Sequence, residues 1–158
     1  MSFDPKINIS DNFTWIEAQC HDGTAIPELL KPNAVKLASQ LEIVRAEWGN
    51  PISTICWYRT AAHNEALRKA AEAVGRTPGT AKDSQHILAK AIDCRPLKMR
   101  DLPAFISCVE SLLKRGKLPR IGGWGTYPQW VHLDVRDKPA DGHIAFWRGE
   151  GVAAEMAA

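Results

Sequence analysis

Apolar positions at helical spacing predict three helices in this chain. The first begins at Pro32, ends before the Gly-Asn-Pro sequence 49–51, and has one apolar stripe formed by Leu37, Leu41, Val44 and Trp48. The second covers about residues 61–74, with Thr60 as its N-cap and a glycine as its stop. The third begins at residues 101–103, and its apolar face consists of Leu102, Phe105, Ile106, Val109, Leu112 and Leu113.

Short segments of β-branched, aromatic or alternating residues predict strands between and after these helices. They comprise residues 52–57, 91–95, 130–135 and 144–147. Residues 121–127 contain three glycines and predict a turn or a strand with bulges. Residues 1–30 are irregular, and the tail from about residue 149 to 158 is predicted to be flexible.

Helices and strands mix without a strict strand–helix–strand rhythm, which favours an α+β fold. We expect a single domain over residues 1–158, with helices packed on a small, mainly antiparallel sheet. The apolar share of 45% and the charged share of 24% are typical of globular proteins.

Charge and hydropathy exclude several classes of protein. The net charge of +2 is too weak to predict a nucleic-acid-binding face. No run of about 18 apolar residues predicts a membrane span, and the first residues lack the apolar core of a signal peptide. We therefore expect a monomer made in the cytoplasm, acting elsewhere only after another route of release.

The four cysteines, Cys20, Cys56, Cys94 and Cys108, form no C-x-x-C pair. Their wide spacing favours buried free thiols over a zinc–thiolate site. Three of the five histidines were also interpreted as ordinary: His21 as a loop residue, His63 as a capping or packing residue, and His143 as a turn residue.

The remaining histidines, His86 and His132, have a carboxylate within reach if the predicted strands pair. Asp93 lies in the strand that follows His86, and His132 lies in a later strand. Two imidazoles and a carboxylate are suitable ligands for a zinc ion that keeps an open position. The spacing alone is weak evidence, because a histidine beside apolar residues is more often structural.

The surrounding motifs are more specific than the spacing. Residues 84–93, with the pattern Ser-x-His-x4-Ala-x-Asp, resemble the first zinc motif of the M15 peptidases, the D-alanyl-D-alanine carboxypeptidase family. Residues 57–64, WYRTAAHN, are similar to the family's GYRSPxxN segment, and residues 122–136 resemble the glycine-rich, Val-His-x-Asp ending of its small phage and bacterial branch. Residues 20–30 resemble the N-terminal segment of that branch.

This resemblance implies a hedgehog/DD-peptidase-like fold and a zinc peptidase acting on peptidoglycan peptides. It implies Zn²⁺ ligands at His86, Asp93 and His132. It also implies that Arg59 contacts the substrate near the scissile carbonyl and that Ser84 helps to hold the substrate.

The chain departs from the family pattern at two positions. Gln129 replaces a glutamate that lies three residues before the second histidine in the best-known members, and an amide cannot act as a general base. Strand alternation places Asp134 on the face of His132, so Asp134 is either the base or a partner that orients a ligand imidazole. Ala89 replaces a frequent glycine, which a negative φ would permit.

Three functions therefore stay open at this point. The first is a zinc metallopeptidase that cleaves stem peptides or crosslinks of peptidoglycan, reaching the wall after lysis-type release or on a virion. The second is a zinc-containing wall-binding module with weak or no turnover, and the third is a metal-free structural part of a phage.

Overall fold

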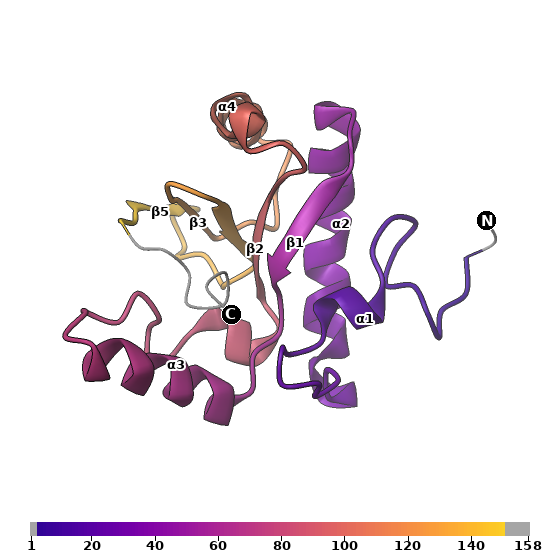
Figure 1. The fold of residues 1–158 in the computed structure, drawn as a ribbon. Helices are drawn as coiled ribbons and strands as arrows, with labels where there is room; N and C mark the ends of the chain where they lie inside the picture. The colour runs from indigo at the N-terminus through magenta and orange to yellow at the C-terminus, as the bar shows by residue number, and fades with distance from the viewer. Residues whose placement is uncertain (1–2, 151–158) are drawn as a thin grey trace.

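The computed structural model describes residues 3–150 (Figure 1). In chain order, its helices and strands are α1 (Trp15–Ala18), η1 (Glu28–Leu30), α2 (Lys31–Trp48), β1 (Ile52–Cys56), α3 (Ala61–Ala73), η2 (Gln85–Leu88), β2 (Ala91–Pro96), η3 (Met99–Asp101), α4 (Leu102–Lys114), β3 (Gly123–Thr126), β4 (Val131–Asp134) and β5 (Ala145–Arg148), where η denotes a short 3-10 helix.

The three predicted helices are confirmed, and their ends follow from local chemistry. Gly49 ends α2 in the left-handed conformation, with φ of 73°. The Thr60 side chain accepts a hydrogen bond from the His63 N–H at 3.1 Å and so caps α3. Residues 3–30 are irregular apart from α1 and η1, because only a few of them lie at helical spacing.

The five strands form one sheet in the order β1-β2-β4-β3-β5. The first three pairings across the sheet are antiparallel, whereas β5 pairs parallel to β3. The α+β prediction is therefore confirmed with a mixed sheet, and the hedgehog-like identity of the fold stays a prediction. None of the helices in residues 3–150 combines the length and apolar character that crossing a membrane requires.

One face of the sheet is apolar and belongs to the core. Ile92, Cys94, Val131 and Leu133 project from β2 and β4 into a buried cluster with Leu41 of α2 and Phe105 of α4. In Figure 1, β1 and β2 separate α2 from α3. Because side chains alternate along a strand, the residues between these apolar ones lie on the opposite face.

That opposite face has a row of residues that crosses all five strands. The register pairs Cys56 with Asp93, Asp93 with His132, His132 with Gly125, and Gly125 with Trp147. Two of the predicted metal ligands are therefore direct neighbours in the centre of the sheet.

The predicted bulge in residues 121–127 is wrong, because β3 pairs with β4 in an unbroken register. The irregularity lies in β1, between Thr54 and Cys56, and it brings Cys56 opposite Asp93. The β3 glycines instead provide space: a Cβ on Gly125 would lie 2.4 Å from Nε1 of Trp147.

The negative φ that would make an alanine tolerable at position 89 is not found. Ala89 has φ of 53° at the end of η2, between His86 and β2. Its N–H donates to the His86 carbonyl at 3.1 Å, and its methyl group is fully buried. The turn that carries His86 therefore includes a strained alanine, where a glycine would be relaxed.

The tail predicted to be flexible, about residues 149–158, lies only partly within the described residues. The Gly149 N–H donates to the Thr126 carbonyl at 2.9 Å, which extends the pairing of β5 with β3. The rest of the tail predicted to be flexible, residues 151–158, lies outside the described residues.

The strain at Ala89 can be measured with a matched pair of variants. Ala89→Gly relieves about 1–2 kcal/mol of left-handed strain, which offsets the lost methyl burial of about 0.8 kcal/mol and the added chain entropy of about 0.5–1 kcal/mol. We expect little net change in the free energy of unfolding by denaturant titration. Ala38→Gly, at an equally buried position in α2, has no strain to relieve and should cost about 1–2 kcal/mol. Equal losses in the two variants would contradict this account.

Candidate metal centre

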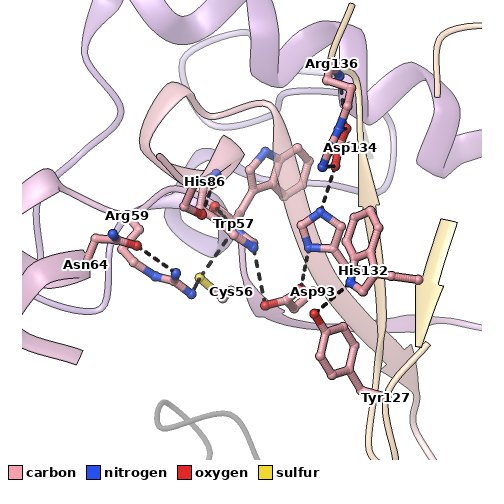
Figure 2. Close-up of polar contacts among 12 residues, drawn as sticks. Cys56, Trp57, Arg59, Asn64, His86, Asp93, Tyr127, His132, Asp134 and Arg136 are labelled. Carbon is pink, nitrogen blue, oxygen red and sulfur yellow. Dashed lines mark hydrogen bonds and ion pairs between the residues drawn. The ribbon is translucent and has the colours of Figure 1, made fainter. Parts of the chain in front are cut away.

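His86, Asp93 and His132 converge on the polar face of the sheet (Figure 2). Oδ1 of Asp93 lies 3.0 Å from Nδ1 of His132, its partner across the β2–β4 ladder. Oδ2 of the same carboxylate lies 3.4 Å from Nε2 of His86, which η2 delivers from the loop before β2. The two imidazole rings are 5.2 Å apart between centroids.

Each imidazole is oriented by an oxygen outside this group of three. Nδ1 of His86 donates to the Trp57 carbonyl at 2.7 Å, so Nε2 is the nitrogen that faces Asp93. Nε2 of His132 lies 2.9 Å from Oδ2 of Asp134, so Nδ1 is the nitrogen that faces Asp93. Metal-ligating histidines are held in this way, with the second nitrogen bonded to a carbonyl or carboxylate.

The charges of the centre depend on one another. Burial alone would raise the pKa of Asp93, but the adjacent imidazoles of His86 and His132 hold that pKa well below its usual range. Burial alone would lower the pKa of His132, but its hydrogen bonds to Asp134 and Asp93 raise it to about 9. The centre thus keeps two buried carboxylates ionised, and the His132 ring lies between them with one nitrogen facing each.

Asp134 is fully buried and both its oxygens are engaged. Oδ1 accepts hydrogen bonds from Arg136, from its backbone N–H at 3.1 Å and from its Nε at 2.8 Å. Oδ2 accepts a hydrogen bond from Nη2 of Arg136 at 2.6 Å and also faces Nε2 of His132. Burial would raise the pKa of Asp134, but His132 and Arg136 keep it below its usual range. This geometry suits a side chain that orients His132.

Arg59 lies beside the centre and is 4% exposed. Its Nη1 donates to Oδ1 of Asn64 at 3.1 Å, and its Nη2 donates to Sγ of Cys56 at 3.4 Å. Its backbone N–H donates to the His86 carbonyl at 3.1 Å, which links the Arg59 segment to η2. Figure 2 shows the guanidinium on the His86 side of the centre.

Asn64 and Ser84 hold the loops around these residues. The Asn64 side chain donates to the Ala81 carbonyl at 3.1 Å, which fixes the loop before η2. The Ser84 hydroxyl accepts from the His86 N–H at 3.3 Å and so caps η2. Ser84 is therefore adjacent to the centre, and its hydroxyl positions His86.

Several residues of the site were missed in the sequence. Nε1 of Trp147 donates to the Tyr127 hydroxyl at 2.9 Å, and the Trp147 ring lies 5.1 Å from the His132 ring. Tyr127 in turn stacks on Trp130 at 4.3 Å. These aromatic residues form a wall beside His132. The sequence does contain a signal for Arg136, because side-chain alternation along a strand places residues 132, 134 and 136 on the same face. It contains none for Trp147, because the sequence does not specify which strand β5 pairs with.

Cys56 is predicted only as a buried thiol outside any disulfide, and this is confirmed. However, donor atoms of Cys56, His86 and Asp93 all lie within 4.8 Å of one another. The bulge in β1 brings the sulfur to the centre, and no linear spacing signals it.

The other histidines differ in their surroundings. His143 is exposed, and its N–H donates to the Asp141 carboxylate at 2.9 Å, as expected for a turn. His21 lies in an exposed turn, as predicted for a loop residue. His63 lies in the first turn of α3, with its ring centroid 6.4 Å from that of His21 and a donor atom near Cys20 and Asp22.

The donor set fits a zinc ion. Two imidazoles and one carboxylate with an open fourth position are a ligand set of catalytic zinc sites, and Nε2 of His86 and Nδ1 of His132 both face Asp93. His132 is not in the group of donors that lie within 4.8 Å of one another, which consists of Cys56, His86 and Asp93, so its ring must shift toward His86 to share an ion. An α+β fold with this centre is typical of metal-dependent hydrolases. The family model for peptidase M15 matches residues 11–134, and the chain therefore belongs to the peptidase M15 family. No curated protein and no solved structure shows significant similarity to the chain.

Membership supports metallopeptidase activity on a peptide substrate. The match ends at Asp134, so Arg136 and Trp147 lie beyond it.

Close packing over β3 gives a test of the Asp134–Arg136 pair. A Cβ on Gly123 would lie 2.6 Å from Nε of Arg136 and 2.8 Å from Oδ2 of Asp134. We expect Gly123→Ala to destabilise the protein by about 1–3 kcal/mol and to weaken zinc binding, because Asp134 orients His132. Denaturant titration and zinc competition with a chelating dye measure the two effects. Gly79→Ala, with nothing within 4 Å of its Cβ, is the control; identical behaviour of the two variants would exclude the packing argument.

Proposed function

We propose that this protein is a zinc metallopeptidase that cleaves peptide bonds in the stem peptides or crosslinks of peptidoglycan. The observation that carries the proposal is the convergence of His86, His132 and Asp93, with each imidazole already oriented by an oxygen behind it. Membership of the M15 family and the motifs that resemble its wall-peptidase branch support the choice of substrate.

His86, Asp93 and His132 would hold the zinc ion. When bound, zinc supplies a Lewis acid that polarises a peptide carbonyl and lowers the pKa of a water molecule to near 7. The protein's own contribution is to prepare the ligands: the Trp57 carbonyl and Asp134 fix the two rings before any ion binds. A prepared centre loses little free energy to rearrangement when the ion or the substrate arrives.

Arg59 would stabilise negative charge on the substrate. The guanidinium stays protonated at every relevant pH, and its hydrogen bonds to Asn64 and Cys56 hold it beside His86. From there it can donate to a carbonyl oxygen that gains charge, or to the terminal carboxylate of a short peptide. Ser84, which caps η2 next to His86, is the second substrate contact that we propose.

The aromatic wall would bind the apolar part of a short peptide. Burial raises the pKa of Tyr127, so its hydroxyl stays protonated. Because that oxygen already accepts from Trp147, its hydrogen remains to be donated to a substrate oxygen.

We assign Asp134 as the residue that orients His132, and we do not assign it as the general base. Both oxygens of Asp134 already accept hydrogen bonds from His132 and Arg136, and the side chain is fully buried. Gln129 occupies the position of the family's glutamate and is partly buried. The transfer of a proton from the attacking water is therefore the catalytic step for which this centre is least well equipped.

This weakness supports one alternative function. A zinc-containing module that binds peptidoglycan with slow turnover would keep the three ligands and tolerate Gln129. Gln129→Glu separates the two functions: it should increase kcat if the missing carboxylate limits turnover, and leave wall binding unchanged.

Activity on purified peptidoglycan tests the function directly. Zinc-loaded protein should release soluble peptides that mass spectrometry detects, a chelator should abolish the release, and added zinc should restore it. His132→Ala should be inactive at every zinc concentration that loads the native protein. His143→Ala, in an exposed turn, is the matched control and should retain full activity. Zinc-loaded protein that cleaves neither stem peptides nor crosslinks would refute the proposal.

Asp134→Asn distinguishes an orienting residue from a base. An orienting role predicts zinc binding weakened about 10- to 100-fold, with a modest loss of kcat once the site is saturated. A general base predicts unchanged zinc affinity and a kcat reduced by about 10²- to 10⁴-fold. We expect the first result, from zinc competition measurements and from kcat at saturating zinc. The second result would return Asp134 to the role of base.

A further inference from the structure

A second group of metal-type donors lies outside the centre described above. One donor atom of each of Cys20, Asp22 and His63 lies within 4.8 Å of the other two. Cys20 and Asp22 belong to the turn before η1, whereas His63 lies in the first turn of α3, about 40 residues later in the chain. The fold therefore brings together a thiol, a carboxylate and an imidazole that linear spacing keeps apart.

The turn that carries the first two donors is well defined. The Cys20 N–H donates to the Thr24 carbonyl at 2.9 Å, and Gly23 has φ of 88°, which allows the tight reversal. The Thr24 N–H donates to Oδ1 of Asp22 at 2.8 Å. Both donor residues are therefore fixed by the backbone around them.

Thr60 connects this turn to α3. Its N–H donates to Sγ of Cys20 at 3.4 Å, and its hydroxyl donates to Oδ2 of Asp22 at 2.8 Å. The same hydroxyl oxygen accepts from the His63 N–H. Thr60 thus holds the Cys20 sulfur and the Asp22 carboxylate directly and the His63 backbone beside them, which is part of the preorganisation that a metal site needs.

The hydrogen bonds among the described residues do not explain why the His63 imidazole is buried at this place. Its Nε2 is buried and has no hydrogen-bond partner among the described residues. A buried polar atom without a partner costs about 1–3 kcal/mol, and such atoms are uncommon in native proteins. A ligand that accepts the lone pair of an imidazole beside a thiol and a carboxylate would remove that cost.

We propose that Cys20, Asp22 and His63 form a second metal site, for a divalent ion of the zinc class. Thiolate and imidazole ligands select zinc over the oxygen-preferring ions Mg²⁺ and Ca²⁺. Zinc bonds of about 2.0–2.3 Å place tetrahedral ligands roughly 3.3–3.8 Å apart, so donors within 4.8 Å need only small shifts. Cys20 is buried and Asp22 is exposed, which leaves the fourth position open toward solvent.

An ion there would join residues 20–24 to the N-terminus of α3. The segment between the two metal centres carries Arg59, so the site would hold that segment in place from the side away from His86. The second site uses none of the ligands of the first, and it does not depend on the proposed peptidase activity.

Zinc stoichiometry tests the proposal on the full-length protein. After equilibrium dialysis, elemental analysis should find about two zinc ions per native chain and about one in His63→Ala and in Asp22→Asn. Asp22 is exposed and His63 is partly exposed, so these variants should fold. His143→Ala is the control and should keep the native content. His132→Ala should lose one ion and retain the other.

Cobalt substitution identifies the sulfur ligand. Co²⁺ bound by a thiolate has a charge-transfer absorption in the near ultraviolet, which should persist in Cys56→Ser and disappear in His63→Ala and in Cys20→Ser. Zinc that stays fully bound in His63→Ala and Asp22→Asn, whether the native protein holds one ion or two, would overturn the proposal. A single native ion that is lost in these variants and kept in His132→Ala would instead support this site and argue against the first.

Discussion

The direct pairing of Asp93 with His132 across β2 and β4 is the contact on which the metal centre depends. It places a carboxylate and an imidazole 3.0 Å apart in the middle of the sheet, where neither can move without breaking the ladder. Sites on strands are held more precisely than sites on loops. His86 is the one ligand that comes from a loop, and it has its own supports: the Trp57 carbonyl, the Ser84 cap and the strained turn at Ala89.

Burial of several charges on one face of a small sheet requires that each charge has a partner. Asp134 is fully buried between His132 and Arg136, and Asp93 lies between two imidazoles. Unpaired, either carboxylate would cost several kcal/mol. The glycines of β3 are part of this arrangement, because only a strand without side chains on that face leaves room for Arg136 and Trp147 to lie over it.

Much of this could be predicted from the sequence, where the signal was local. Periodicity and capping residues gave the helices, and ordered motifs gave the residues around the centre. What failed depended on long-range geometry. The register shift that brings Cys56 opposite Asp93 has no sequence signal, the parallel pairing of β5 depends on packing, and the conformation of Ala89 is imposed by the turn that connects His86 to β2. The cysteine prediction is confirmed, because the described cysteines form no disulfide and Cys20, Cys56 and Cys94 are buried. What the spacing along the chain did not signal is that Cys20 and Cys56 each lie near a carboxylate and an imidazole in the fold.

The extended segment from Cys56 to Thr60 has a larger role than its length suggests. On one side, the Trp57 carbonyl orients His86, and the Arg59 N–H holds the His86 carbonyl. On the other side, Thr60 contacts Cys20 and Asp22 through its N–H and its hydroxyl. A segment this short cannot shift at one end and stay fixed at the other, because its backbone is hydrogen-bonded at both ends. The geometry of Arg59 is therefore set jointly by the candidate metal centre, through His86, and by the turn at Cys20.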